Sequence, residues 1–149
     1  MRTRADFLAI ARQYAADRRL WTTPPRFDPA QRWYACLAET DGVQVWLLTW
    51  LPGQGTDLHD HGGSAGGFVV VEGGLTEATV SGAGLVEREY GAGEGHGFGE
   101  HHIHRMTNTS DRPAISVHAY GPALETMNRY EMSASGPRLV GTDRAGVTW

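Results

Sequence analysis

Residues 53–61 read GQGTDLHDH and end in two histidines, His59 and His61, that a single residue separates. On a β-strand, side chains two residues apart point to the same face. A third histidine, His104, comes from a later segment and stands four residues before Asn108. Each imidazole offers a neutral nitrogen ligand suited to zinc, iron, copper or nickel. The pattern predicts a metal centre with no carboxylate ligand, which keeps its full positive charge and open positions for an anion.

The composition favours an all-β protein, with a single domain spanning residues 1–149. Hydrophobic residues make up 40% of the chain, and 20 Gly with 7 Pro suit many short strands joined by tight turns. The formal charge is −4 and the thirteen basic residues, all Arg, are spread along the chain, so neither nucleic acid nor a membrane surface is expected as a partner. No apolar run reaches the length of a signal core or membrane span, and the lone Cys36 cannot form an internal disulfide. We therefore expect a cytoplasmic protein.

The order of patterns along the chain predicts one helix followed by strands. Apolar residues at helical spacing predict a helix over residues 4–20, which Thr3 and Asp6 help to start. Three prolines within 24–29 then block a helix and predict an extended connector. A β-barrel is expected over about 32–132, with a last strand near Met127, Tyr130 and Met132. The other predicted strands are 32–39, 43–51, 57–60, 67–72, 74–80, 84–90, 96–98, 102–108 and 114–120.

Two histidine spacings resemble the signatures of the cupin superfamily. Gly53, followed after five residues by His59 and then His61, resembles the first signature, and His104 with Asn108 resembles the second. Cupins are small double-stranded β-helices, barrels related to jelly rolls, that hold a metal inside the barrel mouth. The resemblance implies a single-domain cupin barrel with an N-terminal helix.

Two further features narrow the resemblance. The usual cupin pattern has a glutamate ligand at position 66, where this chain has Gly66. A three-histidine cupin without that glutamate resembles the thiol dioxygenases, the family that contains cysteine dioxygenase and 3-mercaptopropionate dioxygenase. Ser116, His118 and Tyr120 resemble the Ser-His-Tyr triad of that family, and strand alternation puts them on one face. The resemblance covers roughly residues 32–122.

The family resemblance implies an iron(II)-dependent thiol dioxygenase. His59, His61 and His104 would bind Fe(II), and a small thiol, cysteine-like or 3-mercaptopropionate-like, would be oxidised with O₂ to a sulfinic acid. The triad would be catalytic, because it orients the tyrosine hydroxyl toward charge that develops on oxygen.

The residues that hold the substrate are less regular. In the family an arginine commonly holds the substrate carboxylate, and a tyrosine stands two residues before it. Here the tyrosine matches Tyr34 but the arginine position is Cys36, and a thiol cannot make the bidentate contact of a guanidinium. Cys36 is expected to be a buried apolar filler. Arg32 shares its strand face if alternation is regular, and Trp50 resembles a pocket-lining tryptophan of the family. Other candidates to reach the pocket are Arg26, Gln44 and Gln54.

Alternatives stay open at this point. The chain could be a non-catalytic cupin that senses a small molecule, or a metal-dependent cupin enzyme with a non-thiol substrate. His96, His101 and His102 compete as ligands, and we expect them on a rim or exposed strand because Asn108 identifies His104 as the motif histidine. No pattern predicts the oligomeric state.

Overall fold

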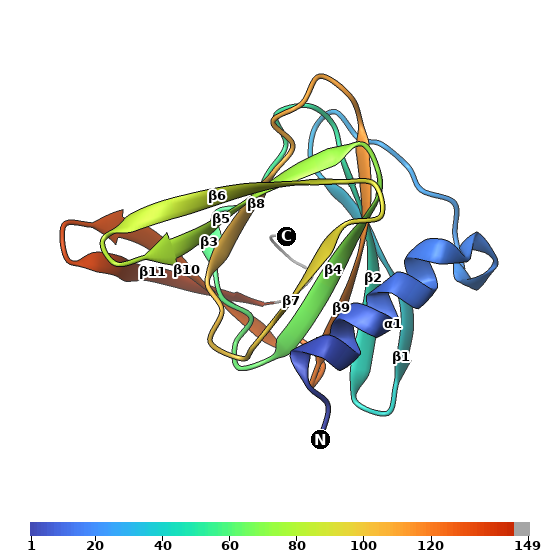
Figure 1. The fold of residues 1–149 in the computed structure, drawn as a ribbon, viewed down its shortest axis with the longest axis horizontal. Helices are drawn as coiled ribbons and strands as arrows, with labels where there is room; N and C mark the ends of the chain where they lie inside the picture. Colours follow the sequence, from blue (N-terminus) through green and yellow to red (C-terminus); the bar gives the residue numbers. More distant parts are fainter. Residues whose placement is uncertain (145–149) are drawn as a thin grey trace.

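The fold is a barrel of two facing antiparallel sheets with one helix on its outside (Figure 1). It is seen in a computed structural model that describes residues 1–144. The all-β prediction with an N-terminal helix is confirmed. The elements, in order, are α1 (Arg4–Ala16), the 3₁₀ turn η1 (Arg18–Leu20), β1 (Trp33–Thr40), β2 (Val43–Trp50), β3 (Leu58–His59), β4 (Ala65–Glu72), β5 (Gly74–Ser81), β6 (Gly84–Gly91), β7 (Gly95–Phe98), β8 (His104–Thr107), β9 (Ala114–Gly121), β10 (Thr126–Ser133) and β11 (Gly136–Arg144).

Helix α1 is shorter than the sequence predicts. It begins with a capping box, in which Thr3 and Asp6 each bind the other's backbone N–H. It ends at Ala16, because the backbone of Asp17 is extended. The carboxylate of Asp17 accepts the backbone N–H of Arg19 and so caps the start of η1. Within residues 1–144 no helix is long and apolar enough to cross a membrane.

Strand β9 lies in the middle of one sheet and is buried on both faces. In the described chain that sheet has five strands in the order β1-β2-β9-β4-β7, and α1 covers its outer face (Figure 1). Val117 and Ala119 pack in the cluster that includes α1 residues, whereas Ser116, His118 and Tyr120 point into the barrel. The sheet therefore presents a row of polar side chains to the barrel interior.

The second sheet is narrowest where β3 meets β8, and we call this contact the waist. Over residues 1–144 its order is β11-β10-β3-β8-β5-β6, and the ladder between β3 and β8 pairs only His59 with His104. The hairpins β5–β6 and β10–β11 extend from this waist to the same side of the molecule (Figure 1). Strand β11 was not predicted, and it carries the sheet to Arg144, beyond the expected end near residue 132. Its sequence, GPRLVGTDR, lacks a buried face that would have marked it as a strand.

Helix α1 approaches β4 so closely that Gly67 has no room for a side chain. A Cβ there would lie 2.8 Å from the backbone N and 3.0 Å from the Cα of Leu8. We expect Gly67→Ala to lower the free energy of unfolding by about 1–3 kcal/mol, because overpacking pushes the helix from the sheet. Urea unfolding with Gly99→Ala as the control tests this, since a Cβ at Gly99 meets nothing within 4 Å. Equal losses in both variants would contradict the expected close packing.

Candidate metal centre

The three histidines of the sequence pattern lie together inside the barrel. His59 ends β3, His61 follows two residues later, and His104 begins β8. Their side chains are buried, and their ring centroids are 4.8–5.0 Å apart in each pair. One ligand atom from each lies within 4.8 Å of the others, which is close enough to hold one metal ion.

The hydrogen bonds of His59 and His104, and the unpaired nitrogens of His61, fit metal binding. The Nδ1 atom of His59 lies 2.7 Å from the carbonyl oxygen of Asp57, and Nδ1 of His104 lies 2.7 Å from a carboxylate oxygen of Glu77. Both oxygens are acceptors, so both Nδ1 atoms carry the proton and each Nε2 keeps its lone pair. Within residues 1–144, neither ring nitrogen of buried His61 has a hydrogen-bond partner. Buried polar atoms rarely stay unpaired, and a metal ion would satisfy one of these two nitrogens.

Burial also keeps the three rings neutral. Loss of solvent lowers the pKa of His59 to about 3 and the pKa of His61 well below its ordinary value. Burial likewise lowers the pKa of His104, although its hydrogen bond to Glu77 opposes the shift. A neutral imidazole is the form that binds a metal, so the protein interior prepares all three ligands.

Position 66 cannot hold a carboxylate ligand in this barrel. A Cβ on Gly66 would lie 2.7 Å from the carbonyl oxygen of Ala119, 2.8 Å from Cδ1 of Tyr120 and 2.9 Å from Cζ of Phe98. Gly66 and Tyr120 are direct partners across β4 and β9. The ring of Tyr120 can therefore take its position only because residue 66 has no side chain. A carboxylate ligand at position 66 and this position of the tyrosine ring exclude each other.

A chain of buried hydrogen bonds runs along β9 toward the histidines. The indole N–H of Trp50 donates to Oγ of Ser116 over 2.9 Å, and this oxygen lies 2.8 Å from Nε2 of His118. Nδ1 of His118 lies 3.3 Å from the hydroxyl of Tyr120. The tyrosine ring centroid is 5.1 Å from that of His61, so the chain of hydrogen bonds ends beside the candidate metal site.

A comparison with known protein families gives a match over most of the chain. The family model described as cysteine dioxygenase type I matches residues 4–133. The chain belongs to the cysteine dioxygenase type I family. This confirms the thiol dioxygenase family that the sequence pattern predicts.

Solved structures similar to this member of the cysteine dioxygenase family show the cupin fold. TT1209 from Thermus thermophilus is 23% identical, with a TM-score of 0.59, over 70% of this chain and 92% of that chain. An uncharacterized conserved protein with a double-stranded β-helix domain from Klebsiella pneumoniae subsp. pneumoniae MGH 78578 is 16% identical, with a TM-score of 0.55, over 95% and 96%. Recombinant oxalate oxidase in complex with glycolate is 19% identical, with a TM-score of 0.58, over 69% of this chain and 59% of that chain.

Arg32 lies beside the candidate site, just before β1. It is 8% exposed, and its guanidinium carbon is 5.2 Å from the ring centroid of Trp50. Among the described residues its Nη1 has no hydrogen-bond partner. Burial lowers the pKa of Arg32 to about 10, which leaves the group charged at neutral pH. A small cavity of about 30 Å³ is lined by Arg32, Thr56, Asp57, His59, Met127, Arg129 and Asp143.

Cys36, at the position where the family commonly has its arginine, does not line this cavity. Cys36 is exposed, its thiol donates to the carbonyl oxygen of Ala38 over 3.5 Å, and the pairing of β1 with β2 is irregular between these two residues. The expectation of a buried filler is therefore wrong. Tyr34 is half-buried, and its ring packs edge-on against Trp46 at 5.9 Å.

The other substrate-binding candidates lie elsewhere. The side chain of Gln44 accepts from Trp46 and from the backbone of Leu124, and Gln54 bonds to backbone atoms of Leu51 and Asp28. Arg26 is exposed. Of the candidates named from the sequence, Arg32 is the one that lines the cavity beside His59.

The competing histidines differ in exposure. His101 is exposed and His96 is partly exposed, as predicted, whereas His102 is mostly buried. His96 and His102 both bind Glu77, a buried carboxylate that sequence reasoning missed. A lone charged residue in the middle of strand β5 is the signal that could have revealed it, because such a residue needs a buried partner.

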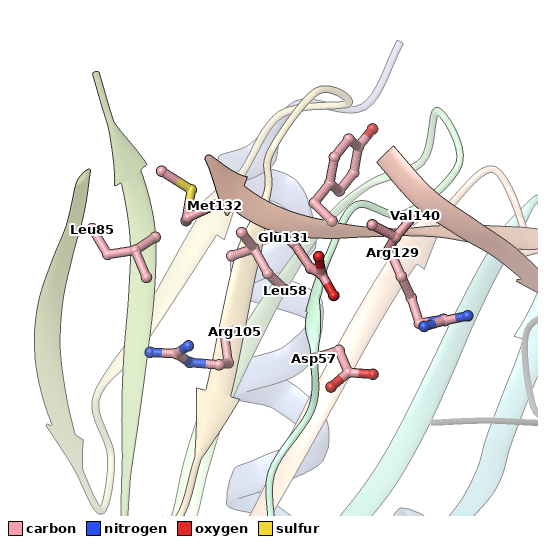
Figure 2. A pocket seen from close by; sticks show the side chains of 9 residues that line it. Asp57, Leu58, Leu85, Arg105, Arg129, Glu131, Met132 and Val140 are labelled. Carbon is pink, nitrogen blue, oxygen red and sulfur yellow. The ribbon is translucent and has the colours of Figure 1, made fainter. Parts of the chain in front are cut away.

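A larger cavity lies on the outer face of the second sheet, the one that carries β3 and β8. Its volume is about 480 Å³, and it lies between the two hairpins (Figure 2). Leu58 and Arg105 line it, and these residues neighbour His59 and His104 in the sequence. Alternation turns adjacent strand residues to opposite faces. The sheet thus lies between the outer cavity and the histidines, although Asp57 and Arg129 line both this cavity and the small cavity beside His59.

Metal binding should clamp the waist of the second sheet. Within residues 1–144 only His59 and His104 pair across β3 and β8. An ion held by both would therefore join the β11-β10-β3 half of the sheet to the β8-β5-β6 half. We expect Fe(II) or Zn(II) at about 1,000 times its dissociation constant to add roughly 4 kcal/mol of stability. Hydrogen exchange should slow most in β3 and β8. His61→Ala is the control, since it removes one ligand and leaves the pair intact. Metal-induced protection confined to other strands would contradict a metal at this position.

Proposed function

We propose that this protein is an iron(II)-dependent dioxygenase that oxidises a small thiol with O₂ to a sulfinic acid. The observation that carries the proposal is the carboxylate-free histidine triad, in which the ring of Tyr120 occupies the space that a ligand at position 66 would need. Iron(II) held by three neutral imidazoles would keep a net charge of two, which lowers the pKa of a thiol and favours its thiolate. Membership of the cysteine dioxygenase type I family supports the same reaction.

Arg32 would bind the carboxylate of the substrate. Its guanidinium is buried beside His59 and has an unpaired donor among the described residues, so an anion there would satisfy a costly buried charge. A thiol that carries a carboxylate two or three carbons away could then reach both the arginine and the metal. The small cavity beside His59 brings Arg32 and this histidine to one site. Cysteine and 3-mercaptopropionate both satisfy these requirements.

The chain of hydrogen bonds along β9 would direct the Tyr120 hydroxyl toward the reacting oxygen. Ser116 accepts from Trp50 and would donate its own proton to Nε2 of His118. Burial lowers the pKa of His118 to about 3, so the ring is neutral. With Nε2 accepting from Ser116, its single proton would be on Nδ1, facing the tyrosine oxygen. Tyr120 would then donate its O–H beside His61 to negative charge that develops on oxygen. Burial raises the pKa of Tyr120, which keeps this proton in place.

Oxygen consumption tests the reaction. The iron(II)-loaded protein should consume O₂ with cysteine or 3-mercaptopropionate and form the corresponding sulfinic acid, detected by mass spectrometry. One O₂ should be used for each sulfinate, because both oxygen atoms end on sulfur. Oxygen uptake with non-thiol substrates alone would favour another cupin enzyme. No uptake across a broad thiol panel, with iron confirmed bound, would favour a small-molecule sensor.

A matched variant separates catalysis from metal binding. Tyr120→Phe keeps the ring beside Gly66 and removes only the hydroxyl, so it should bind iron as the unaltered protein does. Its turnover should fall by roughly 10²-fold, the lower end of what one placed donor contributes. Unchanged turnover with the best thiol would rule out the hydroxyl as the donor.

Arg32→Gln should weaken the binding of thiols that carry a carboxylate. Loss of a charged hydrogen-bond pair costs about 1.5–3 kcal/mol, and we expect KM to rise roughly 10- to 100-fold. KM for cysteamine, which lacks the carboxylate, should change little. Arg26→Gln is the matched control, because Arg26 is an exposed arginine. Equal effects on both thiols would mean that Arg32 does not bind the carboxylate.

A further inference from the structure

Glu77 is a buried carboxylate with four donors around it. It lies in the middle of β5 and is 2% exposed. One oxygen lies 2.7 Å from Nδ1 of His96 and 3.2 Å from the hydroxyl of Tyr90. The other lies 2.7 Å from Nδ1 of His104 and 3.0 Å from Nε2 of His102. A carboxylate offers about four acceptor sites, so these contacts saturate it.

The surroundings of Glu77 suit an anion inside the protein. Four donor groups lie within hydrogen-bond distance of its two oxygens, and a buried carboxylate needs such partners. The carboxylate lies at Nδ1 of His104, so Nε2 of that candidate ligand stays available for a metal.

The cross-strand register explains why Glu77 reaches His104. Thr79 pairs with His104 and Glu77 pairs with Met106 across β5 and β8. Glu77 is thus the diagonal neighbour of His104 on the inner face, within reach of a long side chain.

The ring of Phe98 stacks on His61 at a centroid distance of 4.8 Å and on His102 at 4.7 Å. Phe98 therefore holds the imidazole rings of His61 and His102 in place.

We propose that Glu77 is a positioning residue that orients His104 toward the metal and strengthens it as a ligand, while His96, His102 and Tyr90 hold the carboxylate in place. A carboxylate that accepts the Nδ1 proton fixes the tautomer of a ligating histidine and raises the basicity of Nε2. The inference rests on the proposed metal centre.

This arrangement supplies negative charge without using a coordination position. A glutamate at position 66 would neutralise the metal directly and occupy a site that substrate or O₂ needs. Glu77 acts through the imidazole, so the three neutral ligands stay the only direct protein donors of the proposed centre. The expected electronic effect is to favour the more highly charged state of iron and so to lower its reduction potential.

The same residues could instead bind a second metal ion, because Glu77, His102 and His104 also have ligand atoms within 4.8 Å of one another. Such a site would require Nδ1 of His104 to lose the proton that it donates to Glu77. The saturated hydrogen bonds of the carboxylate favour the positioning role.

Glu77→Gln tests the proposal, since glutamine keeps the shape but replaces one acceptor oxygen with a donor. Chelator competition should give roughly 10- to 100-fold weaker binding of Fe(II) or Zn(II), and the midpoint potential of bound iron should become more positive. Glu89→Gln is the matched control, because Glu89 is an exposed carboxylate in the neighbouring strand β6 and its loss changes the net charge equally.

A second variant guards against a simple structural defect. His96→Leu removes one donor from Glu77 at a partly exposed position and leaves the carboxylate more strongly negative toward His104. The potential should then move in the opposite direction, to more negative values. Shifts of the same sign in both variants would indicate disruption and overturn the proposal.

The remaining outcomes are distinct. Unaltered affinity and potential in Glu77→Gln would also overturn the proposal. Two bound equivalents of Zn(II) in the unaltered protein, falling to one in Glu77→Gln, would assign the cluster to a second metal. Absence of any metal binding by the unaltered protein would refute the metal centre itself, on which this inference depends.

Discussion

The pairing of His59 with His104 across β3 and β8 is the contact on which the site depends. It joins the two hairpins of the second sheet at their narrowest point and sets two imidazoles 4.8 Å apart. His61 completes the group because it follows His59 by two residues. Since the rings are buried and neutral, their mutual repulsion is small and their lone pairs can converge. A misplaced register at this pair would remove both the sheet and the site.

Opposite charges lie on two sides of the triad. Arg32 lines the cavity beside His59, and Glu77 binds the far side of His104. In a buried site such charges act with little screening, so each influences the ligands and any bound anion more than a surface charge would. In the proposed function the cation would attract the substrate, and the anion would act on the metal ligand. Gly66 keeps a third charge out of the centre.

Local patterns made much of this site predictable. His59 with His61, and Ser116 with His118 and Tyr120, follow from strand alternation, which the neighbouring residues alone determine. The helix start at Thr3 was predictable for the same reason. Prediction failed where distant parts of the chain meet. Nothing near Glu77 in the sequence points to the three histidines that lie in β7, in β8 and in the segment between them. Strand β11 forms only because β10 is available to pair with it.

Arg32 and Cys36 illustrate the same limit within one segment. Alternation placed them on one face, yet Arg32 precedes β1 and turns into the barrel, whereas the irregular pairing after Cys36 leaves that residue exposed. The sequence by itself determined the class of fold and the shared face of His59 and His61, because turn residues and period-two spacing act over a few neighbours. It determined the family and His104 through the resemblance of its motifs. Only the tertiary structure decided which charge faces the metal centre and which residues support it, because burial and cross-strand register arise from contacts between segments far apart in the chain.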